Sequence, residues 1–383
     1  METIIKSALR RALEEENPNL RLAAKVSSGV IRKDVDYFQL AKEQFGVDVK
    51  KAKIVAVGVG GAGCNTITRL HELGVYGATT IALNTDAKHL AVTKADKRIL
   101  IGKELTKGLG CGGIPEVGRK AAEESRNEIK EAIEGADMVF VLAGLGKGTG
   151  TGASPVVAEI AKSMGALVIG VVEMPFSAEG SRRFKAEEGL ARLREHADTV
   201  IVIENDRLLK YAGNLTLQQA FAVADELVAN MIKGITETIT LPSLINLDYA
   251  DVRSVMSTGG GVAALGIAES SSSDRARDAV MKALQNPLID VDYTGAAGAL
   301  IHVTGGEDLK LEEVHQIMHH VYSQLDPSAT VFVGARIMPE YEGRIQVITI
   351  VTGVKSPYIL GRISTERALT RETSSLLGIE VLK

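Results

Sequence analysis

The sequence is poor in the residues that mark several large classes of protein. Among its 383 residues are only two cysteines, Cys64 and Cys111, and no tryptophan. Two cysteines are too few for a disulfide framework or a structural zinc site. The formal net charge of −4 offers no basic surface for nucleic acid. No apolar run reaches the roughly 18 residues of a membrane-spanning helix, and the N-terminus lacks the apolar core of a signal peptide. We therefore expect a cytoplasmic protein without a direct membrane span.

The chain is long and rich in glycine. Its 383 residues exceed the size at which single cores stop growing, roughly 300 residues, so we expect two domains. The 39 glycines and the hydrophobic content of 45% fit a well-buried α/β protein. Both cysteines lie in glycine-rich stretches, where small residues beside a loop explain them more simply than a functional thiol pair does.

From residue 52 the pattern alternates between strands and helices. Apolar, β-branched runs predict six strands, at residues 53–61, 77–86, 97–102, 137–144, 165–175 and 197–206. Helical spacing predicts helices that include residues 65–73, 115–135 and 154–164. This order is typical of a parallel sheet with helices on both faces and a ligand at the carboxyl ends of its strands.

The second half of the chain has a different order. A long helical pattern at 215–239 precedes a helix at 274–284, a strand at 298–305, a helix at 311–325 and strands at 329–337 and 344–353. This order predicts a second α/β domain with a mixed sheet. We divide the chain into an N-terminal extension with an amphipathic helix (1–50), a ligand-binding domain (51–214), a central helix (215–240), a C-terminal α/β domain (241–353) and a tail (354–383).

The stretch "AGLGKGTGTGASP", residues 143–155, is the most informative part of the sequence. Alternating glycines allow backbone N–H groups to converge on one point, because glycine tolerates positive φ. A strand precedes the stretch and a helix with Pro155 in its first turn follows it, so a helix N-terminus adds its positive dipole end. The stretch therefore predicts a phosphate site, with Lys147 in its middle.

Two further glycine loops, at 58–63 and 108–113, also follow predicted strands. The first matches the G-x-G-x-x-G dinucleotide fingerprint, and Asp86 ends the next strand where a ribose-binding carboxylate is expected. A nicotinamide-dependent dehydrogenase is therefore a rival interpretation. Three glycine loops favour instead a ligand with several phosphates, and no G-x-x-x-x-G-K-[ST] motif is present, which excludes an ordinary P-loop.

Other polar clusters carry less information. Asn246, Asp248 and Asp251 follow the long helix, and paired carboxylates indicate metal binding or general-base work. His315 and His319 are four residues apart and so share a helix face, but no acidic motif accompanies them. We expect that face to be partly exposed rather than a metal site.

Five motifs in one order carry a family resemblance. "GVGGAGCN", "NTD", "GLGKGTGTGASP", "PFSAEGSRR" and "NLDYADV" together resemble FtsZ, the prokaryotic tubulin-like division GTPases, over residues 52–353. The resemblance implies a tubulin-like fold, in which a Rossmann-like GTPase sheet and a mixed-sheet domain are joined by a long central helix. It also implies GTP hydrolysis, head-to-tail filaments and a place in the division ring at mid-cell.

The resemblance also assigns the nucleotide-binding residues. Asp86, Glu179 and Arg183 would contact ribose and the phosphate region, and Asn205, Phe221 and Asp225 would form the guanine pocket. A carboxylate accepts from guanine N1–H and its 2-amino group, which adenine does not offer. The residues that would cradle phosphates are Gly60, Gly61, Ala62, Asn65, Gly110, Gly112, Gly113, Gly146, Lys147, Gly148, Thr149, Gly150, Thr151 and Gly152.

Catalysis by the resembled family is shared between subunits. Asn246, Asp248 and Asp251 would enter the nucleotide site of the next subunit and orient the attacking water. Such a heterologous contact does not close on itself and yields filaments. Mg²⁺ would be held mainly by phosphates and water, with no protein ligand assigned, and K⁺ is a further candidate cofactor.

The sequence departs from the family pattern at two points. Lys147 replaces a glycine, and Ile114 stands where many relatives have asparagine. Lys147 either faces solvent or reaches the γ-phosphate and partly replaces a monovalent cation. The C-terminal segment resembles that of archaeal family members, which have no long spacer and adaptor peptide. We expect membrane-adaptor or division proteins to bind through the N- or C-terminal segment. A tubulin-like scaffold that turns GTP over poorly stays open as a third interpretation.

Overall fold

A computed structural model describes residues 52–207, 216–241, 243–257, 263–285 and 291–355, together with residues 43 and 46. The amphipathic helix expected near the N-terminus lies outside the described residues, as does the tail beyond residue 355. No helix in the described part is long and apolar enough to cross a bilayer.

The larger sheet contains the six predicted strands, all parallel, in the order β3-β2-β1-β4-β5-β6. Their bounds are β1 Ile54–Val59, β2 Ala78–Asn84, β3 Lys97–Leu100, β4 Met138–Gly144, β5 Leu167–Met174 and β6 Thr199–Glu204. The central strands are continuous apolar runs because helices cover both of their faces. On β1, Ile54 and Ala56 belong to one core cluster, and Val55 and Val57 belong to the other.

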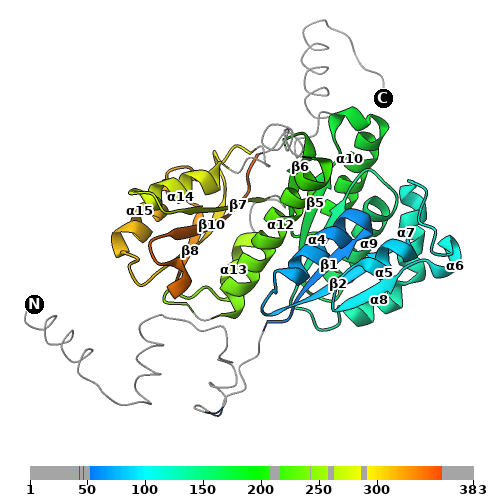
Figure 1. The fold of residues 1–383 in the computed structure, drawn as a ribbon, viewed down its shortest axis with the longest axis horizontal. Coiled ribbons are helices and arrows are strands. Elements are labelled where there is room, and N and C mark those ends of the chain that lie inside the picture. The colour runs from blue at the N-terminus through cyan, green and yellow to red at the C-terminus, as the bar shows by residue number, and fades with distance from the viewer. Residues whose placement is uncertain are drawn as a thin grey trace, which may run out of the picture.

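Helices surround this sheet, as Figure 1 shows. They are α4 Gly60–Glu72, α5 Ala87–Val92, α6 Lys103–Thr106, α7 Pro115–Glu124, α8 Arg126–Ala132, α9 Thr149–Ser163 and α10 Ser181–Arg194, with a short 3-10 turn at Ser177–Glu179. The single helix predicted at 115–135 is wrong in one respect, because it breaks at Ser125. The hydroxyl of Ser125 accepts from the backbone N–H of Gly102. This hydrogen bond connects the break between the two helices to the segment that follows β3.

Helix α9 begins earlier than predicted. It starts at Thr149, inside the glycine stretch, so Pro155 lies within the helix rather than in its first turn. The glycines are needed here for close packing: a Cβ on Gly152 would lie 1.8 Å from the carbonyl oxygen of Pro115, at the start of α7. Glycine has low helix propensity, and this tertiary contact overrides it.

The second sheet is mixed, as predicted, with the order β7-β10-β8-β9. It is formed by β7 Ala263–Ser270, β8 Gly298–Gly305, β9 Thr330–Ile337 and β10 Ile345–Thr352, with helices α13 Tyr249–Ser257, α14 Arg275–Leu284 and α15 Leu311–Tyr322 and a short 3-10 turn at Pro339–Tyr341. Only the β8–β9 pair is parallel. The sequence missed β7, whose small residues suit a close helix: a Cβ on Gly266 would lie 1.9 Å from the carbonyl oxygen of Ala283 in α14.

The long helix α12, Leu217–Thr240, lies between the two sheets (Figure 1). Thr216 and Gln219 form a capping box that fixes its start. Its buried side chains, among them Val228, Ile232 and Ile235, share one core cluster with residues of β1, β4, β8 and β10. The helix therefore belongs to the hydrophobic core on both sides, and its two ends are held in fixed positions.

Candidate functional site

Two helix N-termini meet at the carboxyl edge of the larger sheet. Strands β1 and β4 are neighbours, and the chain leaves them in opposite directions across the sheet, which is the switch point where ligands bind in such folds. Helix α4 begins directly after β1, and four residues separate the end of β4 from the start of α9. A Cβ on Gly60 would lie 2.9 Å from the backbone nitrogen of Gly150, so the first turns of the two helices are in contact.

Neither of these helices neutralises its own N-terminus. Both α4 and α9 lack a side-chain cap, and neither has an acidic residue in its first turn. Their first N–H groups and positive dipole ends therefore stay available to an external anion. Two such termini in contact are suited to a ligand with more than one negative group, such as a chain of phosphates.

Gly60 and Gly61 allow a matched test of this geometry. Gly60 has φ of 74° and faces Gly150, whereas the Cβ position of Gly61 is open. We expect Gly60→Ala to lower the free energy of unfolding of the nucleotide-free protein by about 1–3 kcal/mol, because it adds backbone strain. Gly61→Ala should change it by less than about 0.5 kcal/mol. Urea unfolding measures both values, and equal effects would contradict the contact between the two helices.

The third glycine loop is tied to the start of α9. The backbone N–H of Gly110 donates to the carbonyl of Thr85 at 3.1 Å. The Thr149 hydroxyl lies 3.4 Å from the sulfur of Cys111 and 2.8 Å from the Thr85 hydroxyl. Gly110, Gly112 and Gly113 all have positive φ, so this loop needs glycine for its path. The sequence did not single out Thr85 or Cys111 as site residues, although Thr85 lies in the "NTD" motif.

The two cysteines have different surroundings. Cys64 lies on the buried face of α4, where desolvation raises the pKa of its thiol to about 12. Cys111 contacts the threonines of the loop cluster. Both thiols are free.

Lys147 occupies an ordinary backbone conformation. Its φ is not positive, whereas φ of its neighbour Gly146 is 99°, so the special geometry of the loop falls on the glycine. The N–H of Gly146 donates to the Thr151 hydroxyl at 2.8 Å, which closes the loop onto α9. The side chain of Lys147 is exposed and pairs with no other described residue. Its ammonium is thus available to solvent or to a ligand.

Asp225 lies on α12 beside the first turns of α4. The hydroxyl of Thr66 donates to its carboxylate at 2.7 Å, and Asn65 and Arg69 line the same pocket. Burial raises the pKa of Asp225 to about 6, although the hydrogen bond from Thr66 and the charge of Arg69 act in the opposite direction. A partly desolvated carboxylate is a selective acceptor for paired N–H donors. Thr66 was not predicted as a site residue, and its position in the middle of a helical pattern gave no signal.

Aromatic and amide groups lie near this end of α12. Phe221 packs against Phe176 with ring centroids 6.0 Å apart. The side-chain oxygen of the buried Asn205 finds no hydrogen-bond donor within the described ranges, so it is a ready acceptor. On β5, loss of solvation and the nearby Asp225 raise the pKa of Glu173 to about 8. Glu173 was absent from the sequence prediction.

The three residues predicted to contact ribose and the phosphate region have hydrogen-bond or ion-pair partners within the protein. Glu179 accepts from the backbone N–H of Phe176 at 3.1 Å and pairs with Arg182. Arg183 lies 3.3 Å from a carboxylate oxygen of Glu187. Asp86 accepts from the backbone N–H groups of residues 88 and 89 and so caps α5. These contacts hold the side chains near the loops, and their roles toward a nucleotide stay predictions.

The acidic cluster lies past the other end of α12. Asp248 and Asp251 accept each other's backbone N–H at 2.9 and 3.1 Å, which caps α13, and Asn246 is exposed. Asp251 lies in the first turn of α13. From Asp225 to the end of α12 is 15 residues, or about 22 Å at 1.5 Å per residue. One subunit therefore does not place these acids beside its own nucleotide loops.

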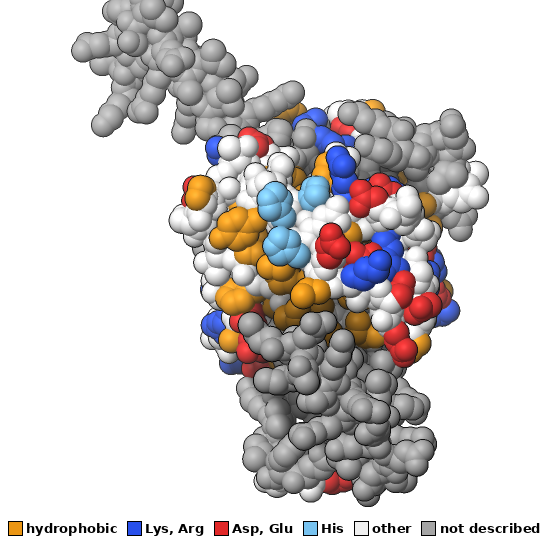
Figure 2. All heavy atoms as spheres, turned by 90° about the vertical axis from the view of Figure 1, so that its left-hand side faces the viewer, with side chains coloured by type: hydrophobic (Ala, Val, Ile, Leu, Met, Phe, Trp, Pro, Cys, Tyr) orange, Lys and Arg blue, Asp and Glu red, His pale blue; other side chains and the backbone are white. Residues whose placement is uncertain are grey.

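The histidines of α15 lie on the surface, as predicted. Figure 2 shows histidine side chains close together on the face formed by the second domain. His315 and His319 are exposed, and the rings of His319 and His320 meet edge to face. Within the described residues no group of three or more metal-binding side chains comes together.

Comparison with known proteins gives consistent matches over most of the chain. Residues 53–213 match the GTPase domain of the tubulin/FtsZ family, and residues 261–355 match the C-terminal domain of the FtsZ family. The chain is 55% identical to cell division protein FtsZ 2 of Methanocaldococcus jannaschii, over 88% of this chain and 89% of the relative. It is 53% identical to FtsZ 1 of Archaeoglobus fulgidus, over 94% and 95% of the two chains.

A solved structure is similar as well. An empty FtsZ dimer from M. jannaschii superposes with a TM-score of 0.76 and 52% sequence identity, and the match covers 83% of this chain and 93% of that chain.

Proposed function

The chain belongs to the FtsZ family of tubulin-like GTPases, and we propose that the contact between the N-termini of α4 and α9 is its GTP phosphate site. Membership makes it a GTP-binding and GTP-hydrolysing protein that forms filaments in cell division. The observation that carries the site assignment is the pair of uncapped helix N-termini at the switch point of the sheet. The predicted phosphate-binding glycines and threonines lie on these two helices, in the stretch 145–148 that leads into α9, or on the loop at 108–113.

The guanine end of the ligand fits the groups near the start of α12. Asp225 would accept from guanine N1–H and the 2-amino group, and the buried, unpartnered oxygen of Asn205 is a second acceptor. Phe221 offers a ring face, braced by Phe176. Glu179, Arg183 and Asp86 would contact ribose and phosphates. The residues proposed for the two ends of a guanine nucleotide lie toward the carboxyl edge of the larger sheet.

Hydrolysis is completed between subunits in this proposal. Because the acids of α13 follow the end of α12, which lies about 22 Å along the helix from Asp225, a second copy stacked head to tail would bring Asp248 and Asp251 to the first copy's phosphates. There the carboxylates would orient the attacking water and accept its proton, with Asn246 as a hydrogen-bonding neighbour. A Mg²⁺ held mainly by phosphate and water oxygens would neutralise charge on the phosphates. The relative solved as a dimer supports self-association.

Family membership decides between the alternatives that the sequence left open. The dehydrogenase interpretation is wrong, because the glycine fingerprint of α4 belongs to a tubulin/FtsZ GTPase domain. The remaining alternative is a filament that binds GTP and turns it over poorly. GTP-dependent light scattering measured together with phosphate release separates the two: scattering without release of phosphate would contradict the hydrolytic assignment.

The cellular setting is part of the proposal. We place the protein in the cytoplasm at the division site, in keeping with the cell-division role of its relatives. Adaptor or division proteins would bind its terminal segments, and pelleting assays with and without residues 1–50 test this. We also propose that the domain boundaries are those expected from the sequence, with α12 as the connection.

The exposed Lys147 leads to a prediction about the affinity for the γ-phosphate of GTP. Because its side chain is exposed on the phosphate loop and pairs with no other described residue, its ammonium would add a point charge beside the γ-phosphate. We expect Lys147→Gly to weaken GTP about 3- to 10-fold relative to GDP and to increase the response to added K⁺. Lys147→Arg, which keeps the charge, is the control. An unchanged GTP-to-GDP affinity ratio and K⁺ response would make Lys147 a solvent-facing side chain only.

A further inference from the structure

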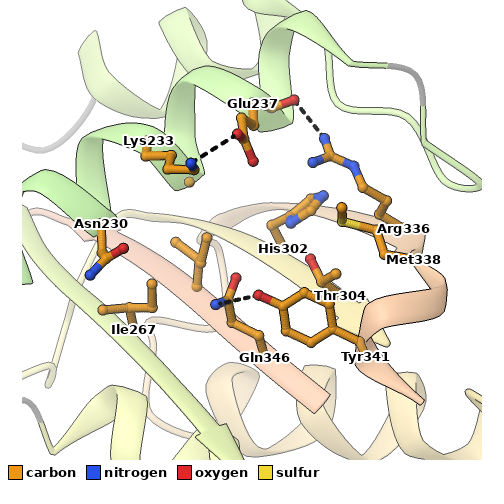
Figure 3. A pocket seen from close by; sticks show the side chains of 12 residues that line it. Asn230, Lys233, Glu237, Ile267, His302, Thr304, Arg336, Met338, Tyr341 and Gln346 are labelled. Atoms are coloured by element: carbon orange, nitrogen blue, oxygen red, sulfur yellow. Dashed lines mark hydrogen bonds and ion pairs between the residues drawn. The ribbon is translucent and has the colours of Figure 1, made fainter. Parts of the chain in front are cut away.

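A polar pocket lies between α12 and the second sheet, away from the nucleotide loops (Figure 3). From α12, four residues at helical spacing face it: Asn230, Lys233, Gly234 and Glu237. The helix approaches the sheet closely here, because a Cβ on Gly234 would lie 2.3 Å from Ile348. The pocket has a volume of about 90 Å³. This is well above the roughly 15 Å³ that one water molecule requires.

The strand register brings the polar residues of the sheet together. Thr304 on β8 pairs with Arg336 on β9 and with Gln346 on β10, so the three side chains stand on one face. His302 precedes Thr304 by two residues and therefore shares this face. Figure 3 shows the side chains of His302, Thr304 and Arg336 grouped beneath the end of α12.

Arg336 is a buried cation without a close carboxylate. Only 2% of the residue is exposed, and within the described chain no carboxylate oxygen lies within 4.0 Å of its guanidinium. Its Nη2 donates to the backbone carbonyl of Glu237 at 2.6 Å, and its Nε has no acceptor. Burial lowers the pKa of Arg336 to about 10, so it stays charged at neutral pH. The carboxylate of Glu237 lies 3.8 Å from Lys233, and the three side chains together carry one net positive charge.

His302 adds a second unpartnered group to the same wall. It is 1% exposed, and both of its ring nitrogens are without a hydrogen-bond partner among the described residues. Burial and the charge of Arg336 lower the pKa of His302 far below its usual value, so the ring is neutral and keeps one N–H donor. The hydroxyl of Thr304 is a further donor on the lining of the pocket.

Buried donors of this kind are costly when they are left unpaired. A buried charge without a compensating charge destabilises the folded protein, and each unsatisfied donor destabilises it further. An anion with two or more acceptor oxygens removes these costs together, and Arg is the side chain best matched to carboxylate and phosphate oxygens. Water would supply acceptors but no charge.

We propose that this pocket binds a small oxyanion, a carboxylate or inorganic phosphate, through Arg336 Nε, the His302 ring and the Thr304 hydroxyl. The site shares no residue with the nucleotide loops, so the proposal is independent of the assignment of the GTP site. An anion there would contact residues of both the second sheet and α12, and would hold the two together.

The test uses the full-length protein saturated with GDP. Its thermal midpoint is followed in increasing potassium phosphate or potassium acetate, with potassium chloride at equal ionic strength as the reference. A ligand that binds only the folded state raises the midpoint in proportion to ln(1 + [L]/Kd). We expect a rise with at least one of the two oxyanions beyond the chloride reference. The two arms distinguish a phosphate site from a carboxylate site.

Variants test whether the rise in thermal midpoint comes from oxyanion binding in this pocket. Thr304→Val keeps the side-chain shape and should weaken the oxyanion at least about 5-fold, and Arg336→Met should abolish the response. Thr330→Val, at the exposed start of β9 and outside the pocket, should respond like the wild type. Should Arg336→Met fail to fold, Thr304→Val and Arg336→Lys decide. An absent response in the wild type, or one that persists unchanged in Thr304→Val and Arg336→Met or Arg336→Lys, overturns the proposal.

Discussion

Replacing Asp225 by alanine is expected to weaken GTP binding by roughly 10²- to 10⁴-fold. In the proposed pocket the carboxylate accepts two N–H groups of guanine, and hydrogen bonds to a charged group contribute about 1.5–3 kcal/mol each. The fold should persist, because Thr66, which donates to Asp225 at 2.7 Å, also lies 3.3 Å from the carbonyl of Ala62. Equilibrium binding of a fluorescent GTP analogue measures the loss. Equal affinity of the wild type for ATP and GTP would contradict the pocket assignment.

The same carboxylate predicts a pH dependence. With its pKa raised to about 6 by burial, Asp225 becomes protonated in the free protein below that pH and loses its acceptor charge. GTP affinity should therefore be constant above pH 7 and fall as the pH decreases through about 6. Asp225→Asn is the control, because it lacks this titration while the phosphates titrate in both proteins. Identical pH profiles for the two proteins would show that Asp225 does not contact the base.

Replacing Asp251 by alanine is expected to lower GTP turnover by roughly 10²- to 10⁴-fold, the usual contribution of a positioned acid or base. GTP binding by the dilute monomer should be unchanged, because Asp251 lies past the far end of α12 from Asp225. Asp251→Asn separates chemistry from folding: its amide oxygen can still accept from the backbone N–H of Asp248, as the carboxylate does at 3.1 Å, but it is no base. Phosphate release at saturating GTP is the measurement.

Mixing two inactive variants tests whether the site is shared. Asp251→Ala retains a complete nucleotide pocket, and Asp225→Ala retains the acids of α13. At junctions where the second variant stacks on the first, one complete site forms, so the mixture should recover part of the wild-type turnover. Wild-type turnover per subunit should also rise steeply with protein concentration. A mixture as inactive as its components, together with constant turnover at high dilution, would contradict catalysis in trans.

The fold was largely predictable because its signals are local. Six continuous β-branched runs gave the parallel sheet, and the change of element order after residue 240 gave the mixed sheet. The failures occurred where tertiary contacts override propensity. The small residues of β7 fit against α14, with Gly266 beneath the carbonyl of Ala283, and α9 extends through glycines that are packed against α7.

The candidate site was predictable only where a motif carries its own chemistry. The glycine loops and the acids of "NLDYAD" stood out by residue type. Thr66, Glu173 and Arg336 did not stand out. The role of a hydroxyl in a helix or of a charged side chain on a strand cannot be predicted until its neighbours in the fold are known. Asp225 was assigned only through the family resemblance, and its contact with Thr66 spans 159 residues of sequence.

The sequence by itself therefore indicated the family, most of the element order and the glycine loops proposed to bind phosphate, since glycine spacing and hydrophobic period act over a few residues. Only the tertiary structure decided which groups are buried together. The packing of α12 between two sheets separates Asp225 from the acids of α13 by the length of a rigid helix. The same packing buries Arg336 beside His302 without a carboxylate partner among the described residues. Desolvation and charge pairing depend on such long-range neighbours, and no local pattern encodes them.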